Sequence, residues 1–254
     1  MSTPVPEYVA PHGLLAGKKV LVTAAAGTGI GFAAAKKAVE EGATVVVSDK
    51  HERRCAESAA ELGVTGIPCD VTVEEDVQAL IAGAADALGG LDVVINNAGL
   101  GGEVPIVDMT DDQWNLVLDV TLNGTFRCMR AELKYLYEHG GGVIVNNASV
   151  LGWRAQEGQA HYAAAKAGVM ALTRCAAIEA AAHGVRVNAV APSLAMHPFL
   201  AKVTSDELLA ELEQREAFGR AAEPWEIANV MIFLASDYSS YMTGEVVSVS
   251  SQHP

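Results

Sequence analysis

Near its amino end the chain reads Val20-Leu-Val-Thr-Ala-Ala-Ala-Gly-Thr-Gly-Ile-Gly31. The apolar run Val20–Thr23 predicts a buried strand, and a helical pattern begins at about Gly31. Glycines in a turn between strand and helix let the backbone approach a pyrophosphate, whose charge then meets the helix N-terminus. Any tight strand-to-helix turn favours glycine, so this signal alone is weak. It predicts a dinucleotide site that includes Gly27, Thr28, Gly29, Ile30 and Gly31.

Strand and helix patterns alternate along the rest of the chain. The expected strands cover residues 20–23, 44–48, a run ending at 69, 91–95, 143–145, 185–190 and 245–249. The expected helices cover about 31–41, 52–62, 74–88, 111–138, 161–182 and 224–236. The strands are nearly continuous apolar runs, as expected where helices cover both faces of a parallel sheet. We therefore predict an α/β, single-domain Rossmann fold with a doubly wound, seven-stranded parallel sheet.

Two flanking features complete the expected domain organisation. Residues 1–16 contain Pro4, Pro6, Pro11 and Gly13 and predict an N-terminal arm, so the domain covers residues 17–254. Residues 194–219 are the least regular segment between the predicted strands. We expect this segment to form a loop over the substrate.

Composition limits the classes of partner. The chain has 254 residues, half of them apolar, and a net charge of −14. That charge, without a local basic patch, argues against nucleic acid or an anionic membrane surface as a partner. No apolar run reaches membrane-spanning length, and the start lacks the pattern of a secretory signal. The four cysteines show no metal-ligand spacing, so we expect no metal, free thiols and a cytoplasmic protein.

An acidic residue, Asp49, ends the second predicted strand, eighteen residues after Gly31. At that place a carboxylate can accept the ribose hydroxyls of a dinucleotide and would repel a 2′-phosphate, which favours NAD over NADP. Lys50, Arg53 and Arg54 are the opposing signal, because cations can bind that phosphate. Their alternative role is the solvated face of a helix, and we predict NAD as the cofactor.

Ser149, Tyr162 and Lys166 are the candidate catalytic residues. Tyr162 and Lys166 are four residues apart, so a helix places them on one face. An ammonium beside a phenol stabilises the phenolate and is expected to lower the phenol pKa, which is about 10 without such neighbours. A phenol of lowered pKa can exchange a proton with an alcohol. Ser149 can point its hydroxyl at the same oxygen, although a Tyr-x-x-x-Lys pair also arises by chance.

Taken in order, these motifs resemble those of the short-chain dehydrogenase/reductase family over about residues 15–250. The resemblance rests on the glycine-rich turn, Asp70-Val71, Asn96-Asn-Ala-Gly99 and the Ser, Tyr and Lys above. It implies interconversion of a secondary alcohol and a ketone by hydride transfer with NAD(H). It also implies that Lys166 holds the nicotinamide ribose. The other cofactor contacts it implies are Asp70, Val71, Asn97, Ala98, Gly99, Tyr162, Pro192 and Ser193.

The sequence departs from the family pattern at several places. The first glycine of the turn is replaced by alanine, and the turn is one residue longer. The catalytic Asn of the long helix falls on Thr121, which either takes over its water-holding role or leaves the proton relay to another group. Asn123 is expected on the far side of that helix and does not replace it. The remaining departures are Pro192-Ser193 for Pro-Gly, His197 for Thr, and Ser250-Ser251-Gln252 for Asp-Gly-Gly.

Within the family, the turn, residues 147–154 and residues 250–254 resemble a subgroup linked to bacterial sterol breakdown. Its members are hydroxyacyl-CoA dehydrogenases of the sterol C/D-ring remnant, often labelled 3-oxoacyl-acyl-carrier-protein reductases. The resemblance implies a small-molecule substrate in the form of a CoA thioester. A fatty-acid 3-oxoacyl reductase, a polyol dehydrogenase and a non-catalytic cofactor-binding sensor stay open as alternatives. The family usually forms homotetramers through its long helices, which implies the same assembly here.

Overall fold

The computed structural model describes residues 2–196 and 206–251, with the backbone alone for residues 206–208. Over these residues the sheet contains β1 (Lys19–Val22), β2 (Thr44–Asp49), β3 (Thr65–Pro68), β4 (Val93–Asn96), β5 (Gly142–Asn147), β6 (Val185–Pro192) and β7 (Val246–Val249). The α-helices are α1 (Ile30–Glu40), α2 (Glu52–Leu62), α3 (Glu74–Leu88), α4 (Asp111–Leu118), α5 (Gly124–Glu138), α6 (Ala160–Ala180), α8 (Asp206–Arg215) and α9 (Pro224–Ala235).

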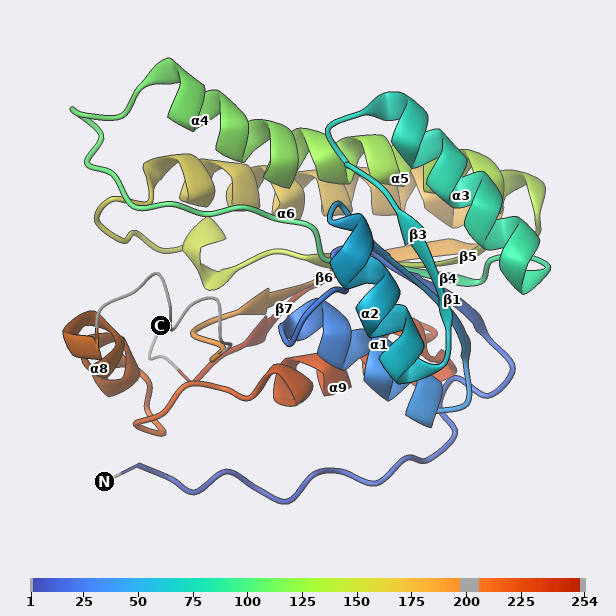
Figure 1. The fold of residues 1–254 in the computed structure, drawn as a ribbon, viewed down its shortest axis with the longest axis horizontal. Helices are drawn as coiled ribbons and strands as arrows, with labels where there is room; N and C mark the ends of the chain where they lie inside the picture. Colours follow the sequence, from blue (N-terminus) through green and yellow to red (C-terminus); the bar gives the residue numbers. More distant parts are fainter. Residues whose placement is uncertain (1, 197–205, 252–254) are drawn as a thin grey trace.

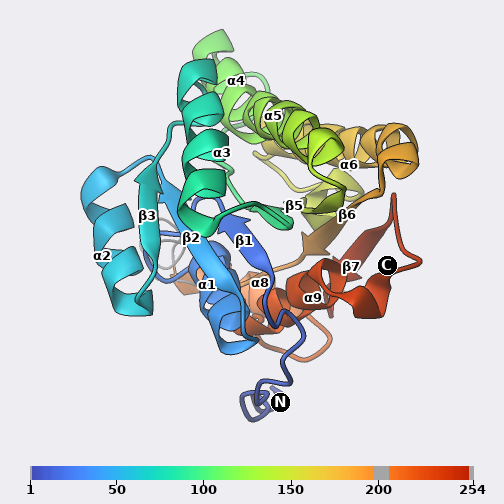
Figure 2. The ribbon, with the colours of Figure 1, turned by 90° about the vertical axis from the view of Figure 1, so that its right-hand side faces the viewer.

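The sheet confirms the predicted Rossmann fold. Its seven strands are all parallel and lie in the order β3-β2-β1-β4-β5-β6-β7. Figures 1 and 2 show α3, α4, α5 and α6 on one side of the sheet, and α1, α2 and α9 on the other. The strand order changes direction between β1 and β4. In such sheets the crevice that binds ligands opens at the carboxyl ends of the strands at this switch point.

Burial explains why the strands are continuous apolar runs. Every residue of β4 is buried, and so are Val20, Leu21 and Val22 of β1. On one side α1 and α9 pack against these strands through small and flexible side chains such as Ala34 and Met231. On the other side α3 and α5 supply Leu80, Ala84, Cys128 and Ala131. The two apolar layers hold the carboxyl ends of the strands in fixed positions.

The helix predicted over residues 111–138 is present over that range, but a π-helical turn that the sequence did not predict lies in its middle. A π-helical turn, Asp119–Asn123, separates α4 from α5, and the Gly124 N–H donates to the Asp119 carbonyl five residues back. A π-turn inserts an extra residue and rotates the helix surface that follows it. Thr121 stands at its centre and is fully buried. Local propensity carries no signal for this interruption.

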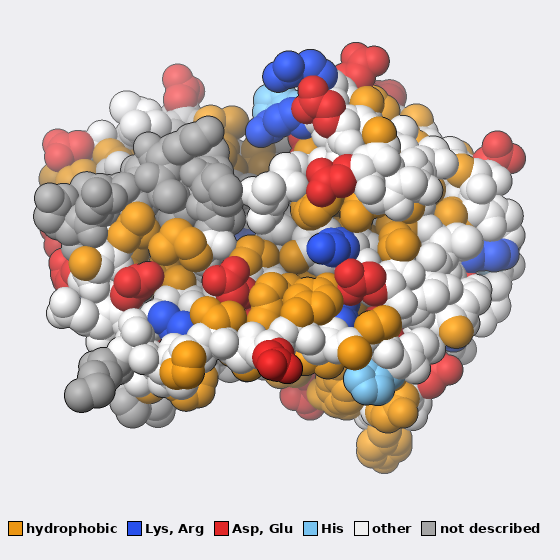
Figure 3. Space-filling view, turned by 60° about the horizontal axis from the view of Figure 1, so that its bottom comes forward, with side chains coloured by type: hydrophobic (Ala, Val, Ile, Leu, Met, Phe, Trp, Pro, Cys, Tyr) orange, Lys and Arg blue, Asp and Glu red, His pale blue; other side chains and the backbone are white. Residues whose placement is uncertain are grey.

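Residues 2–12 form no helix or strand and run along the lower edge of the molecule in Figure 1. The Tyr8 ring packs edge-on against Trp225 of α9, with 5.2 Å between the ring centroids. Lys37 of α1 donates to a backbone carbonyl of the arm, and the Glu41 carboxylate accepts from two of its N–H groups. Figure 3 shows this side of the molecule, where hydrophobic side chains gather between single charged ones. Lys37 in α1 and Glu41 just after it are buried, and the arm supplies hydrogen-bond partners for both charged side chains.

Candidate active site

The glycine-rich turn leads from β1 into α1 and adopts a backbone conformation that needs its glycines. Gly27 has φ +89°, a region in which other residues are strained. A β-carbon at Gly31 would lie 2.4 Å from both the Ala24 carbonyl oxygen and Asn97 Nδ2, so only glycine fits there. Gly29 precedes α1 without a side-chain cap, and no acidic side chain lies in the first helical turn. The N–H groups of this turn are therefore suited to an anion.

Asn97, directly after β4, ties the turn to the neighbouring strands. Its Nδ2 donates to the Ala24 carbonyl at 3.0 Å, and its backbone N–H donates to Thr23 Oγ1 at 3.0 Å. Its Oδ1 accepts from Asn147 Nδ2 at 2.8 Å. Ala98 N–H also approaches Thr23 Oγ1, at 3.4 Å. These bonds join the carboxyl ends of β1, β4 and β5 at the switch point.

Asp49 lies beside the same turn, at the end of β2. Its Oδ2 accepts from the Ala26 N–H at 3.4 Å, and its Oδ1 accepts from the His51 N–H at 2.9 Å. Burial raises the pKa of the Asp49 carboxyl above its ordinary value, while the Ala26 N–H and the charge of Arg54 oppose that rise. The carboxylate therefore lies where the turn and the end of β2 meet.

Two of the basic residues after Asp49 contact carboxylates at the surface. Lys50 Nζ lies 2.7 Å from Asp70 Oδ2, and Arg53 lies 3.8 Å from Glu57 one helical turn on. The Lys50 and Arg53 side chains are 64% and 86% exposed, and Arg53 lies on the solvated face of α2, as expected. The bonds from Lys50 and Thr72 outweigh burial and hold the pKa of the Asp70 carboxyl below its ordinary value. The cations thus have roles that need no 2′-phosphate.

Val71 and Gly99 lie at close contacts between elements. A β-carbon at Gly124, the first residue of α5, would lie 2.7 Å from Val71 Cγ2, so Val71 packs directly against that helix. A β-carbon at Gly99 would lie 3.3 Å from Lys166 Nζ and 3.8 Å from Thr121 Oγ1. Gly99 therefore brings the chain after β4 next to the candidate catalytic lysine.

Pro192 ends β6 and Ser193 follows it. The Ser193 hydroxyl donates to Glu216 Oε2 at 3.0 Å. The sequence patterns did not single out Glu216, which follows α8 and lies far from Ser193 in the chain. His197, the other candidate in this loop, lies outside the described residues.

The structure brings Ser149, Tyr162 and Lys166 together. Ser149 follows β5, and its hydroxyl accepts from the Leu151 N–H at 3.2 Å; Tyr162 and Lys166 lie in the first turns of α6. The Ser149 hydroxyl lies near enough to the Tyr162 phenol to oppose the rise of its pKa. Lys166 Nζ lies 5.5 Å from the centroid of the Tyr162 ring and donates to the Asn147 carbonyl. Polar side chains from the carboxyl end of β5 and the amino end of α6 thus lie together.

The expected lowering of the phenol pKa by Lys166 is wrong for this structure. Burial raises the pKa of Tyr162 to about 12, and the hydrogen bond with Ser149 opposes that rise. Burial also lowers the pKa of Lys166 to about 8. Both groups lose hydration here, and the ammonium turns to the Asn147 carbonyl, so the loss of solvent outweighs the attraction between them. At neutral pH the phenol keeps its proton and the ammonium is mostly charged.

Thr121 stands at the position of the expected Asn, and its hydroxyl is hydrogen-bonded to the residues that follow β4. Its Oγ1 accepts from the Leu100 N–H at 2.9 Å and donates to the Leu100 carbonyl at 3.0 Å. A hydroxyl has one proton, so Thr121 has none left for a relay while both bonds are made. Of the two alternatives, the arrangement favours a proton route through another group.

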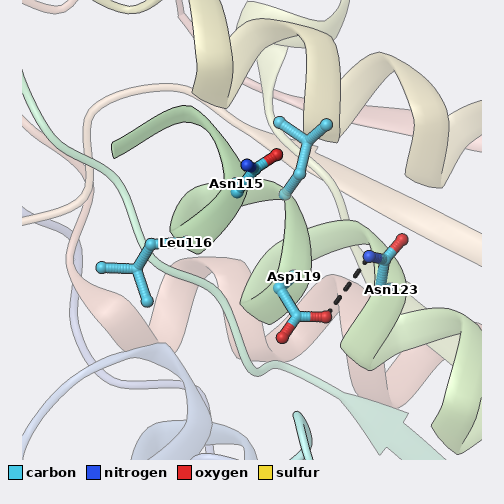
Figure 4. Close-up of a pocket in the computed structure, with 5 residues that line it drawn as sticks. Asn115, Leu116, Asp119 and Asn123 are labelled. Carbon is cyan, nitrogen blue, oxygen red and sulfur yellow. Dashed lines mark hydrogen bonds between the residues drawn. The ribbon is translucent and has the colours of Figure 1, made fainter. Parts of the chain in front are cut away.

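Asn123 lies on the outer face of the π-turn, as predicted. Its Nδ2 donates to Asp119 Oδ1 at 3.3 Å, and Figure 4 shows the two side chains facing each other. This face lines a cavity of about 420 Å³ whose walls are Asn115, Leu116, Leu118, Asp119 and Asn123. The cavity contains none of the candidate catalytic residues, so it is separate from the site.

Three residues near the site were missed by the sequence patterns. Asn147 holds both Asn97 and Lys166 and is the second asparagine of a pair that ends β5. His161 is buried, and its Nδ1 accepts from the Tyr162 N–H at 2.9 Å; burial lowers its pKa. The adjacency of His161 to Tyr162 was the available signal. Glu216 offers no local signal, because its partners come from β6 and β7.

Two further findings concern metals and membranes. Among residues 2–196 and 206–251, no three His, Cys, Asp or Glu side chains gather in a way that could hold a metal ion. In the same part of the chain, no helix has the length and apolar character needed to cross a bilayer. Cys55, Cys69 and Cys128 are buried free thiols, and Cys175 is exposed.

The fold and the site together define a class, a Rossmann-fold protein with a Ser–Tyr–Lys group beside its dinucleotide turn. A family whose model is described as Enoyl-(Acyl carrier protein) reductase matches residues 24–251. The chain is 63% identical, over 98% of its length and 98% of the relative, to (5R,7aS)-5-hydroxy-7a-methyl-1-oxo-2,3,5,6,7,7a-hexahydro-1H-indene-carboxyl-CoA reductase of Mycobacterium tuberculosis. It is 37% identical to a 3-oxoacyl-acyl-carrier-protein reductase of Vibrio harveyi, over 93% of this chain and 97% of that protein.

A solved structure agrees with these relatives. The crystal structure of a short chain dehydrogenase from Mycobacterium smegmatis matches with a TM-score of 0.89 and 57% identity, over 99% of both chains. The protein belongs to the short-chain dehydrogenase/reductase family. It is an oxidoreductase of hydroxy and oxo groups, and the resemblance read from its motifs is confirmed.

Proposed function

We propose that the protein transfers a hydride between NAD(H) and a ring alcohol or ketone carried on a CoA thioester. The observation that carries the proposal is that Ser149, Tyr162 and Lys166 come together in one group. This group lies at the carboxyl end of β5, near the strand ends that Asn97 joins to the glycine-rich turn. One small polar group thus stands where a dinucleotide and a second substrate can meet.

The residues around the turn fit a nicotinamide dinucleotide. β-carbons at Gly27 and Gly29 would meet nothing within 4 Å, so the outer side of the turn is open beside the uncapped start of α1. This surface would hold the pyrophosphate, and Asp49 would accept the hydroxyls of the adenosine ribose. Lys166 would hold the other ribose. When bound, the nicotinamide supplies the hydride acceptor or donor.

Tyr162 is the acid–base group of the proposed reaction. With its pKa raised to about 12, the phenol holds a proton at neutral pH and can donate it to the oxygen of a ketone that is being reduced. The Ser149 hydroxyl would hold the same oxygen. The ammonium of Lys166 would stabilise the phenolate that remains, because opposite charges attract strongly in a buried site. In the oxidation direction the same groups act in reverse.

The substrate class follows from the similarity to the hexahydroindene-carboxyl-CoA reductase. The chain around the phenol supports a ring substrate. A β-carbon at Gly101 would lie 3.6 Å from the Tyr162 ring, so two glycines after Leu100 leave the approach to the phenol narrow but free of side chains. Trp153 is 51% exposed three residues after Val150 and offers an apolar surface at the same end of the sheet.

One kinetic screen tests the proposal. Purified protein would be assayed with NAD(H) and NADP(H) against three substrate classes: sterol-ring CoA thioesters, 3-oxoacyl thioesters of CoA and acyl carrier protein, and polyols. We expect the highest kcat/KM with NAD(H) and the ring thioester. Preference for NADPH and acyl-carrier-protein thioesters would instead support the fatty-acid reductase, which the 37% identical relative keeps in view. NADH binding without any turnover would contradict an enzymatic role.

We also propose a homotetramer formed through the long helices. Leu116 of α4, Phe126 of α5 and Ile178 of α6 are 55%, 43% and 81% exposed, which is unusual for apolar side chains of this size on one set of helices. Sedimentation of the wild type and of Ile178→Asp tests this, since a charge at a buried helix contact should dissociate the assembly. A cytoplasmic location belongs to the same proposal and is supported by the free thiols.

A further inference from the structure

Glu216 is a buried carboxylate outside the catalytic group. It is 4% exposed, although its neighbours Arg215 and Ala217 are exposed. Its Oε2 accepts from Ser193 Oγ at 3.0 Å and from Ser251 Oγ at 2.8 Å. Its Oε1 accepts from the Leu194 N–H at 3.3 Å. Hydrogen bonds to a carboxylate are about twice as strong as neutral ones, so these three bonds hold Ser193, Leu194 and Ser251 firmly at Glu216. We call this set of bonds the Glu216 joint.

The two serines stand at positions where the family pattern has glycine. Ser193 replaces the glycine of Pro-Gly after β6, and Ser251 replaces the first glycine of Asp-Gly-Gly after β7. A glycine at either place has no hydroxyl to donate. Two departures that lie nearly sixty residues apart in the chain therefore meet on one carboxylate. The shared partner Glu216 explains why both positions carry serine instead of glycine.

Backbone bonds show what this joint connects. The Ala222 N–H donates to the Leu194 carbonyl at 2.8 Å, and the Met196 N–H donates to the Ala222 carbonyl at 2.9 Å. The Ala217 N–H donates to the Ser251 carbonyl at 2.7 Å. These bonds pair the residues after β6 with the residues after α8. We call the paired residues the base of the segment, and the Glu216 carboxylate connects this base to Ser251 after β7. The base encloses both ends of the segment 194–219.

We propose that Glu216 is a positioning residue that holds the base of the substrate loop against the carboxyl ends of β6 and β7. It acts through Ser193, which is itself an expected cofactor contact, and through the Leu194 N–H. The described ends of this segment, at Leu194 and Glu216, therefore keep one placement relative to β6 and β7. This inference rests on the proposed function, because it takes residues 194–219 as the substrate loop.

The first test needs no substrate. Amide hydrogen exchange would be measured on peptides containing Leu194 and Ala222 in the full chain. Glu216→Ala and Ser251→Gly should each speed exchange in these peptides about tenfold, since each removes a bond to a buried charged group. The matched control is Glu211→Ala, an exposed carboxylate on α8 that pairs with Arg215 and reaches no strand. Exchange that stays at the wild-type rate in both variants overturns the proposal.

The second test is kinetic and separates positioning from chemistry. In Glu216→Ala, KM for the ring thioester should rise about tenfold while kcat falls less than threefold, since Tyr162 and Lys166 are untouched. Glu216→Gln keeps an oxygen for Leu194 and should recover part of the loss. Ser251→Gly should add nothing to Glu216→Ala, because both act on one joint. Additive effects overturn the proposal. If the wild type turns over none of these substrates, the proposed function fails, and the exchange result still decides the role of Glu216.

Discussion

Asn96 and Asn97 are neighbours in the chain, yet they belong to two separate hydrogen-bond networks. Asn96 Nδ2 donates to Glu132 of α5 at 2.9 Å and to Asn146 of β5 at 3.1 Å, so this pair lies under the helices. Asn97 pairs with Asn147 and bonds the glycine-rich turn. Side chains alternate across a strand, so two adjacent asparagines on each of two paired strands form two separate networks.

The two networks differ in what they bury. The one under the helices contains a fully buried carboxyl, Glu132, and leaves Glu132 Oε1 and Asn96 Oδ1 without a hydrogen-bond partner. Burial raises the pKa of Glu132 to about 8. The network beside the turn contains no carboxyl group, joins Asn97 and Asn147 to Thr23 and Ala24, and leaves Asn147 Oδ1 without a partner. One network therefore buries a carboxyl group, and the other lies next to the candidate catalytic lysine. The predictions below test that division.

The largest effect is expected at the candidate catalytic group, Ser149, Tyr162 and Lys166. Tyr162→Phe removes the proton donor and leaves the ring, so kcat should fall by about 10³-fold or more, within the usual range for a general acid. Thermal unfolding and NADH titration should stay close to wild type. Turnover near the wild-type level in this variant would remove Tyr162 from the mechanism.

In the network that contains Glu132, the raised pKa of this carboxyl predicts that the stability of the protein depends on pH. Its folded pKa of about 8 exceeds the ordinary 4.5, so the folded state holds an extra proton between these values. The stability from that proton is complete below pH 4.5 and is lost as pH rises toward 8, at up to about 1.4 kcal/mol per pH unit. Glu132→Gln should abolish this slope and be the more stable protein at pH 8.

Urea unfolding at several pH values measures that slope. The control is Glu138→Gln, an exposed carboxyl on the same helix, which should follow the wild type. NADH affinity of Glu132→Gln should not change, because Glu132 bonds Asn96 and none of the residues that join the glycine-rich turn. Equal slopes in the wild type and Glu132→Gln would show that the buried carboxyl is ionised in the folded protein.

The paired asparagines offer the most direct comparison. Asn97→Ala leaves the Ala24 carbonyl and the Asn147 amide without partners, which should weaken NADH binding about tenfold. Asn96→Ala should lower the free energy of unfolding and leave NADH affinity within twofold. Fluorescence titration and urea unfolding of both variants measure the two quantities. Similar losses of NADH affinity in both would mean that the two networks are coupled through the strand.

The smallest effect concerns the choice of cofactor. Asp49→Ser removes the carboxylate that should repel a 2′-phosphate, so the ratio of kcat/KM for NAD over NADP should fall by roughly tenfold. Lys50→Ser is the matched control, because Lys50 contacts Asp70 at the surface and should leave the ratio unchanged. An unchanged ratio in Asp49→Ser would move the determinant of specificity elsewhere.

Much of the fold and the site was predictable because its signals are local. Each strand run and each glycine turn is read from a few adjacent residues, and the single helical turn that separates Tyr162 from Lys166 needs only their spacing. Three features escaped this reading. The π-turn at Asp119–Asn123 depends on packing around Thr121, the raised pKa of Tyr162 depends on burial, and the partners of Glu216 come from β6 and β7.

The order and spacing of the motifs alone establish a dinucleotide fold, its family and the identity of the candidate catalytic residues, since these follow from periodicity and from residues near one another in the chain. The electrostatics of those residues arise only on folding. Whether Tyr162 is a phenol or a phenolate depends on how much water the surrounding helices exclude, and that balance reversed the predicted pKa shift. The joining of Ser193 and Ser251 on one buried carboxylate likewise requires three distant segments to meet, which no local pattern encodes.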